Sequence, residues 1–171
     1  MPPRILFVLL LTQLVSTAGM FGVIWQVQLI TYPQFASIDP VSFPEFHLQY
    51  CQRITWIVGP LMLLELASTS LSTLALWNTR WRMGSLACLV IVGTLWLITA
   101  LVQVPQHEVL SFGFDPAVAE ALVLGNGWRV AGWTLHLAVV SGIIFTWCRS
   151  RMPTIFESEN STLTSQENSD C

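Results

Sequence analysis

A single acidic residue, Glu65, interrupts the long apolar stretches of this chain and is the first candidate for chemistry. Ionisable side chains are costly inside a lipid bilayer, so they usually serve a function or pair with another polar group there. His136 lies in the last apolar stretch, at a depth where it can meet Glu65. We predict that Glu65 and His136 form a catalytic, proton-handling pair. The alternative is a structural pair that holds two helices together.

Further polar residues near the outer ends of the same stretches are candidates for substrate binding. Two arginines precede the second and fourth stretches, where they would orient an oxygen atom or an anion through charge-assisted hydrogen bonds. Glutamine, asparagine, tyrosine and histidine side chains nearby would complete the site. The predicted set is Tyr32, His47, Arg53, Gln103, His107, Asn126 and Arg129.

The spacing of histidines and cysteines predicts no metal site and identifies no cofactor. The chain has three His and four Cys, without the HxxxH, HExxH, CxxC or haem-attachment spacings. A metal site built from His47, His107, His136 and Glu65 stays open, as does non-covalent haem held by two histidines. Dinucleotide-binding, P-loop and Gly-x-Ser-x-Gly motifs are absent from the sequence.

The composition predicts an integral membrane protein. Hydrophobic residues make up 53% of the 171 residues and charged residues only 10%, with a mean hydropathy of +0.62. A soluble domain carries about 25% charged residues. All seven basic residues are arginines, and they form no basic patch of the kind that binds nucleic acid. We expect the lipid bilayer and a lipophilic small molecule as partners, and no nucleic acid; the oligomeric state is left open.

Four apolar stretches are long enough to cross a bilayer, which takes about 20 helical residues. They cover about 5–32, 54–77, 84–104 and 130–148. A backbone in hydrocarbon must satisfy its own hydrogen bonds, so each stretch should be helical. We predict an all-α integral membrane four-helix bundle over 1–152, with an uncleaved first helix rather than a signal peptide. The polar segment 153–171 is predicted to be a disordered tail.

The arginines predict the orientation in the membrane. If the spans alternate, the side that carries both termini holds five arginines and the other side holds two, Arg53 and Arg129. The positive-inside rule then places both termini and the tail in the cytoplasm. We expect a bacterial inner membrane. The five arginines of the cytoplasmic side are Arg4, Arg80, Arg82, Arg149 and Arg151.

The two outer connections follow one pattern. Each starts with Pro-Gln, continues with Asp-Pro and reaches an arginine fourteen residues after the aspartate, in the pairs Asp39/Arg53 and Asp115/Arg129. We favour two repeated helical hairpins; the alternative is that Asp-Pro simply starts helices. Each connection is predicted to hold a short interfacial helix. The first would start at the capping box 42–45, and the second would end near 125–127.

Three short motifs lie at the ends of the predicted spans: Tyr32-Pro33, Val104-Pro105-Gln106-His107 and Asn126-Gly127-Trp128-Arg129. In order and type they resemble a family of four-span bacterial and fungal membrane proteins that includes the anthrone oxygenases. The resemblance covers most of 15–145 and matches the family at Tyr32, Pro33, Pro105, Asn126 and Arg129. His107 stands where the family shows asparagine. The resemblance implies oxidation of a membrane-soluble aromatic or quinone-like substrate without an obvious cofactor.

The sequence therefore predicts a multi-pass membrane protein, and the resemblance implies an oxygenase or oxidoreductase acting on a lipophilic aromatic or quinone-like compound. The alternative is a small transport or accessory subunit that binds an anionic solute or a partner helix. Whether the protein is an enzyme is left open at this point.

Overall fold

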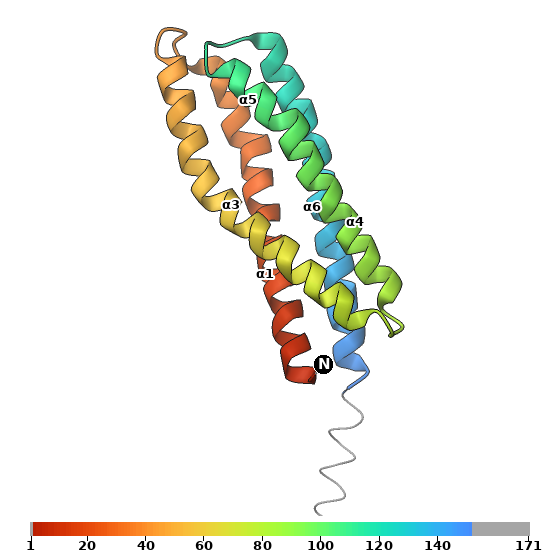
Figure 1. Cartoon of the computed structure of the whole chain (residues 1–171). Helices are drawn as coiled ribbons and strands as arrows, with labels where there is room; N and C mark the ends of the chain where they lie inside the picture. Colours follow the sequence, from red (N-terminus) through yellow and green to blue (C-terminus); the bar gives the residue numbers. More distant parts are fainter. Residues whose placement is uncertain (1, 152–171) are drawn as a thin grey trace, which may run out of the picture.

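The computed structural model describes residues 2–151, which form a bundle of four long helices (Figure 1). No β-strand occurs in this part of the chain, so the predicted all-α four-helix bundle is confirmed. The predicted tail 153–171 lies outside the described residues. In chain order the elements are α1 (Pro3–Gln26), the π-helical turn η1 (Val27–Thr31), α2 (Tyr32–Gln34), the 3-10 turn η2 (Phe35–Ser37), α3 (Phe43–Leu76), α4 (Arg82–Ile98), the π-helical turn η3 (Thr99–Gln103), α5 (Val104–Leu110) and α6 (Pro116–Arg149).

Each of the four helical segments is long and apolar enough to cross a membrane, as a multi-pass membrane protein requires. The segments run for 29 to 35 residues, or about 44 to 52 Å at 1.5 Å per residue, which exceeds a hydrocarbon core of about 30 Å. Both ends of the described chain lie at one end of the bundle, and the loops at 38–42 and 111–115 lie at the other (Figure 1). We call the latter the distal end. The cytoplasmic location of the termini stays a prediction.

The short interfacial helices predicted for the two distal connections are not separate elements. The residues before Arg53 form the start of α3, and those before Arg129 form the start of α6. No residue at either junction breaks the helical hydrogen bonds, and Gly125 and Gly127 keep a helical backbone instead of ending a helix. The second and fourth spans are therefore eleven and fourteen residues longer at their distal ends than predicted.

Two aspartates organise the starts of these long helices in different ways. Asp115 is the N-cap of α6, where its Oδ1 accepts hydrogen bonds from the backbone N–H groups of Ala117 (2.9 Å) and Val118 (3.2 Å). The capping box predicted at Ser42 is wrong. The Ser42 hydroxyl and backbone N–H both donate to the Asp39 carboxylate (3.3 and 3.2 Å), so this hydroxyl makes no cap bond to α3.

The π-helical turns η1 and η3 occupy equivalent places in the first and third helical segments. The backbone N–H groups of Tyr32 and Val104, just after them, donate to carbonyl oxygens five residues earlier. A proline follows each of these residues, and its missing N–H and its clash with the carbonyl four residues back widen the local helix. This shared construction is what a repeated hairpin would show. Both Tyr32 and Gln103, the last residue of η3, are buried.

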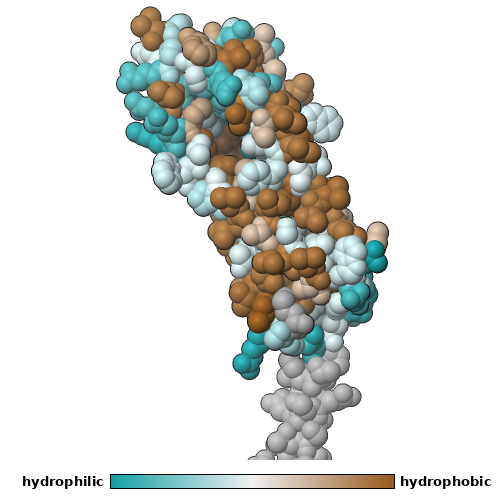
Figure 2. Space-filling view, viewed as in Figure 1, coloured by the Kyte–Doolittle hydropathy of each residue, from teal (hydrophilic) through white to brown (hydrophobic). Residues whose placement is uncertain are grey.

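The bundle has a polar interior and a largely apolar exterior. Apolar side chains cover most of the visible middle of the molecule, and polar residues gather at its two ends (Figure 2). Buried polar side chains include Gln13, Glu65, His136 and Arg129. Since polar groups in a membrane protein avoid lipid, any site for chemistry should lie between the helices.

Candidate functional site

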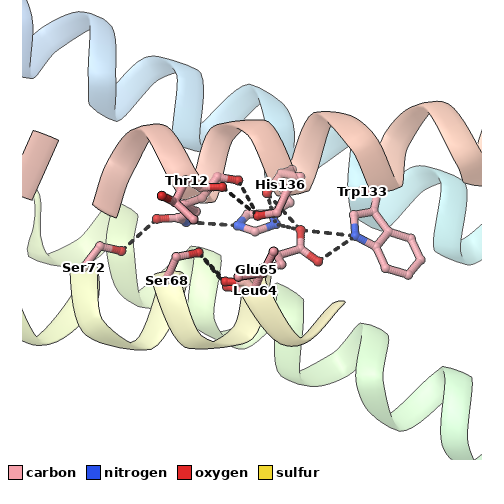
Figure 3. Close-up of polar contacts among 10 residues, drawn as sticks. Thr12, Leu64, Glu65, Ser68, Ser72, Trp133 and His136 are labelled. Carbon is pink, nitrogen blue, oxygen red and sulfur yellow. Dashed lines mark hydrogen bonds and ion pairs between the residues drawn. The ribbon is translucent and has the colours of Figure 1, made fainter. Parts of the chain in front are cut away.

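Glu65 and His136 meet in the middle of the bundle, as predicted (Figure 3). His136 Nδ1 of α6 lies 2.8 Å from Glu65 Oε1 of α3. Thr17 of α1 donates to the same oxygen (2.9 Å), and Trp133 Nε1 lies 3.2 and 3.0 Å from the two carboxylate oxygens. All four side chains are buried. Three helices are therefore joined at one carboxylate, and we call this set, with Gln13 and Ser72, the Glu65 network.

Gln13 and Ser72 complete the Glu65 network on its side nearer the termini. Gln13 Nε2 lies 3.2 Å from His136 Nε2, and the Ser72 hydroxyl donates to Gln13 Oε1 (2.7 Å). If the His136 proton is on Nδ1, it donates to Glu65, while Nε2 accepts from Gln13. With the amide of Gln13 rotated, its oxygen can instead accept from a protonated Nε2. The network thus suits both protonation states, and its saturated hydrogen bonds fix three helices.

Gln13, Thr17 and Ser72 are not among the predicted site residues. Each is a single uncharged polar residue in an apolar stretch. Such residues are common in membrane helices, so their presence alone is weak evidence for a functional site. Their burial on facing helices is what distinguishes them.

A cavity of about 320 Å³ lies in the distal half of the bundle, between α3 and the α4–α5 segment, with α1 and α6 behind it. Figure 2 shows a recess on this face. The volume falls in the range of about 300 to 1,000 Å³ that is typical of small-molecule sites. The wall is mainly apolar and includes Ile24, Val27, Ile54, Val58, Met62 and Trp96.

Four polar side chains converge on this cavity from four different elements. Arg129 Nη1 donates to Gln103 Oε1 (3.4 Å) and to Asn126 Oδ1 (3.2 Å). The Tyr32 hydroxyl donates to Gln103 Oε1 (3.4 Å) and lies 3.1 Å from His107 Nε2. Tyr32, Gln103, His107 and Arg129 all line the cavity. The first π-helical turn leads into Tyr32 and the second ends at Gln103, which explains how both reach the same wall.

Arg129 brings an unmatched positive charge to the cavity. Its side chain is 5% exposed, and its Nε has no hydrogen-bond partner in residues 2–151. The guanidinium lies over the Trp133 ring, 5.2 Å from the centroid. The only acid–base pair within ion-pair distance in the described chain is His136 with Glu65. Buried charges require compensation, so this site retains capacity for an anionic or oxygen-bearing ligand.

Trp133 lies between Glu65 and Arg129. Its indole N–H donates to the Glu65 carboxylate, and the Arg129 guanidinium lies over its ring. Neither Glu65 nor His136 lines the cavity. These two residues can position Arg129 through Trp133, but they do not touch a molecule bound in the cavity. Their catalytic role stays a prediction.

Arg53 does not share the cavity with Arg129, although the two arginines occupy equivalent places in the sequence pattern. It is exposed on α3 and lines a separate surface depression with Gln26 and Gln49. Asn126 is buried beside Arg129 rather than in the cavity wall. Its Nδ2 donates to Gln28 Oε1 (2.8 Å), which ties α6 to the first helical segment.

Two of the predicted residues form a cluster with a cysteine at the distal end. His47 Nε2 lies 3.0 Å from His107 Nδ1. Cys51, one turn after His47 on α3, has its Sγ 3.7 Å from both of these nitrogens. Cys51 is not among the predicted site residues; the available signal is its i, i+4 spacing from His47, which places both on one helix face.

No family model, curated protein or solved structure matches this chain. The resemblance to the anthrone oxygenase family therefore stays a prediction. Fold and site together define a class: multi-pass helical membrane proteins with a ligand-sized cavity between their helices.

Proposed function

We propose that this protein binds a lipophilic aromatic or quinone-like compound in the distal cavity and acts on it as an oxidoreductase of the oxygenase type. One observation carries the proposal: a mainly apolar cavity ends at a buried arginine that has no carboxylate partner within residues 2–151. The apolar wall suits a ring system, and the arginine suits its oxygen. A compound of this kind would reach the cavity from the lipid.

The polar end of the cavity suits a phenol bound as its phenolate. His107 and Tyr32 line the cavity side by side, so their polar groups can hydrogen-bond to the oxygen of the bound compound. The phenolate would be stabilised by the guanidinium of Arg129 in a site of low dielectric constant. A phenolate is richer in electrons than the phenol, and it is the form that an oxygenase presents to dioxygen. Gln103 holds Tyr32 and Arg129 in place by accepting from both.

A carrier or accessory subunit that binds an anionic solute is the second candidate, because the unmatched charge of Arg129 would also attract a small anion. The apolar wall favours the first candidate. Arg129 is the one arginine that lines the cavity, and a small hydrated anion would gain little from the aliphatic and aromatic side chains around it.

Ligand titration tests the proposal. The full chain in detergent is titrated with a short-chain naphthoquinone or with anthrone, and binding is followed by the change in total tryptophan fluorescence, to which Trp96 in the cavity wall contributes. We expect Arg129→Gln to weaken binding about 10-fold to 100-fold, since charged hydrogen bonds contribute about 1.5–3 kcal/mol. Arg53→Gln is the matched control and should bind as tightly as the wild type. Equal affinities in both variants would contradict the proposal, and tighter binding of acetate than of the aromatic compounds would favour the carrier.

A further inference from the structure

We infer that His47, Cys51 and His107 form a binding site for one copper or zinc ion at the distal end of the bundle. This inference goes beyond the proposed function and does not depend on which compound occupies the cavity. It rests on three observations: the triangle formed by the ligand atoms, the partners of the remaining ring nitrogens, and the packing of aromatic rings around His47.

The three candidate ligand atoms form a triangle of suitable size. His47 Nε2 and His107 Nδ1 are 3.0 Å apart, and Cys51 Sγ is 3.7 Å from each. Tetrahedral zinc, with Zn–N of about 2.0–2.1 Å and Zn–S of about 2.3 Å, requires edges of about 3.3 Å between nitrogens and about 3.6 Å from nitrogen to sulfur. The observed edges differ from these values by about 0.3 and 0.1 Å. One ion can therefore contact all three atoms after small side-chain adjustments.

The two ring nitrogens outside this triangle also have oxygen partners. His47 Nδ1, which is 3.8 Å from Cys51 Sγ, lies 3.3 Å from the Ser111 hydroxyl, and His107 Nε2 lies 3.1 Å from the Tyr32 hydroxyl. Metal-binding histidines almost always donate their second N–H to an oxygen, which fixes the tautomer and the ring orientation. With an ion in the triangle, both outer nitrogens carry protons and donate to Ser111 and Tyr32. Each of the four ring nitrogens then either binds the ion or donates a hydrogen bond.

The cluster is packed against aromatic rings and lies near the distal end of α3. The rings of Phe35 and Phe43 lie 5.6 and 5.5 Å from that of His47, which is fully buried. His47 precedes Glu65 by eighteen residues, or about 27 Å along the helix, so an ion could enter from the aqueous side of the distal end. Rigid packing around the ligands reduces the entropy that is lost on binding.

The ligand types select the kind of ion. A thiolate with two imidazoles suits copper and zinc, whereas magnesium, calcium and manganese prefer oxygen ligands. Three protein ligands also leave a fourth position for water or another small ligand, as in catalytic zinc sites. Because the thiol must lose its proton on binding, metal affinity should fall as the pH is lowered.

Metal titration of the full chain tests the site. The detergent-solubilised protein is stripped with a chelator, dialysed, and titrated separately with Zn²⁺ and with Cu⁺ under reducing conditions; bound metal is counted after gel filtration. We expect one ion per chain, and the arm with the higher affinity identifies the metal. Cys51→Ser and His107→Gln should each weaken binding at least tenfold. Cys148→Ser, at another partly buried cysteine, is the matched control and should bind as the wild type does.

The Tyr32→Phe variant tests the positioning of His107. Loss of an oxygen partner of this kind costs about 10-fold to 100-fold in metal affinity, and helical content by circular dichroism should not change. The absence of bound metal, or equal affinities in Cys51→Ser and Cys148→Ser, would overturn the inference. Cys51 does not line the cavity, so Cys51→Ser should still bind the naphthoquinone. Failure of the metal site and failure of the proposed function are therefore separate outcomes.

Discussion

The Glu65 network and the Arg129 cavity are both buried and polar, but they differ in how completely their groups are paired. Glu65 accepts from Thr17 and Trp133 and contacts His136, and it lies outside the cavity wall. Arg129 keeps an unpaired Nε beside a cavity and has no carboxylate partner in residues 2–151. A saturated network stabilises a fold, whereas an unsaturated one beside a cavity can still bind a ligand. The cost of burying a charge therefore does not by itself identify a binding site.

Removal of Glu65 should have the largest effect on stability. Glu65→Ala leaves His136, Trp133 and Thr17 without their shared acceptor, and breaking a buried pair typically costs about 3–5 kcal/mol. We expect a lower free energy of unfolding, measured by chemical denaturation in detergent. Glu120→Ala, at an exposed position of α6, is the control and should change little. If the two variants were equally stable, the Glu65 network would not hold the helices together.

Substitution of Gly125 by alanine should crowd the Gln103 side chain and so weaken ligand binding, although no polar group is removed. A Cβ atom at Gly125 would lie 2.5 Å from Gln103 Nε2, whereas one at Gly127 would meet nothing within 4 Å. Gly125→Ala should displace the amide that holds Arg129 and Tyr32, and we expect about a fivefold loss of naphthoquinone affinity, or about 1 kcal/mol. Gly127→Ala makes the same change in helix propensity, which favours the helix in both variants, and should bind normally. Equal losses in the two variants would point to a general effect on α6.

The smallest effect is expected for the stability of the ligand-free protein after Arg129→Gln. The substitution removes an unmatched buried charge and keeps a side chain that can donate to Asn126 and Gln103. Its free energy of unfolding should stay within about 1 kcal/mol of the wild type, because loss of favourable hydrogen bonds is offset by the lower cost of desolvation. Denaturation without ligand measures this difference. A loss as large as that of Glu65→Ala would make Arg129 a structural residue and remove the contrast between the two regions.

The membrane-spanning character of the helices could be predicted because it depends on local properties. Apolar stretches longer than about 20 residues must be helical in a bilayer, and Asp115 caps α6 as its Asp-Pro motif suggests. The contact between Glu65 and His136 was also predictable, since both are polar and lie at compatible depths. The same local reasoning placed helix ends at the arginines, where the backbone in fact continues without a break.

Tertiary structure alone decided which polar residues share a site. Arg53 and Arg129 follow the same sequence pattern, yet one is exposed and the other is buried, because the rotation of each helix about its axis depends on packing along its whole length. Cys51 and His107 are 56 residues apart in the chain and meet only where α3 approaches α5. Hydropathy and turn motifs describe each helix by itself. Distances between side chains on different helices depend on packing among all four, which no single stretch of sequence contains.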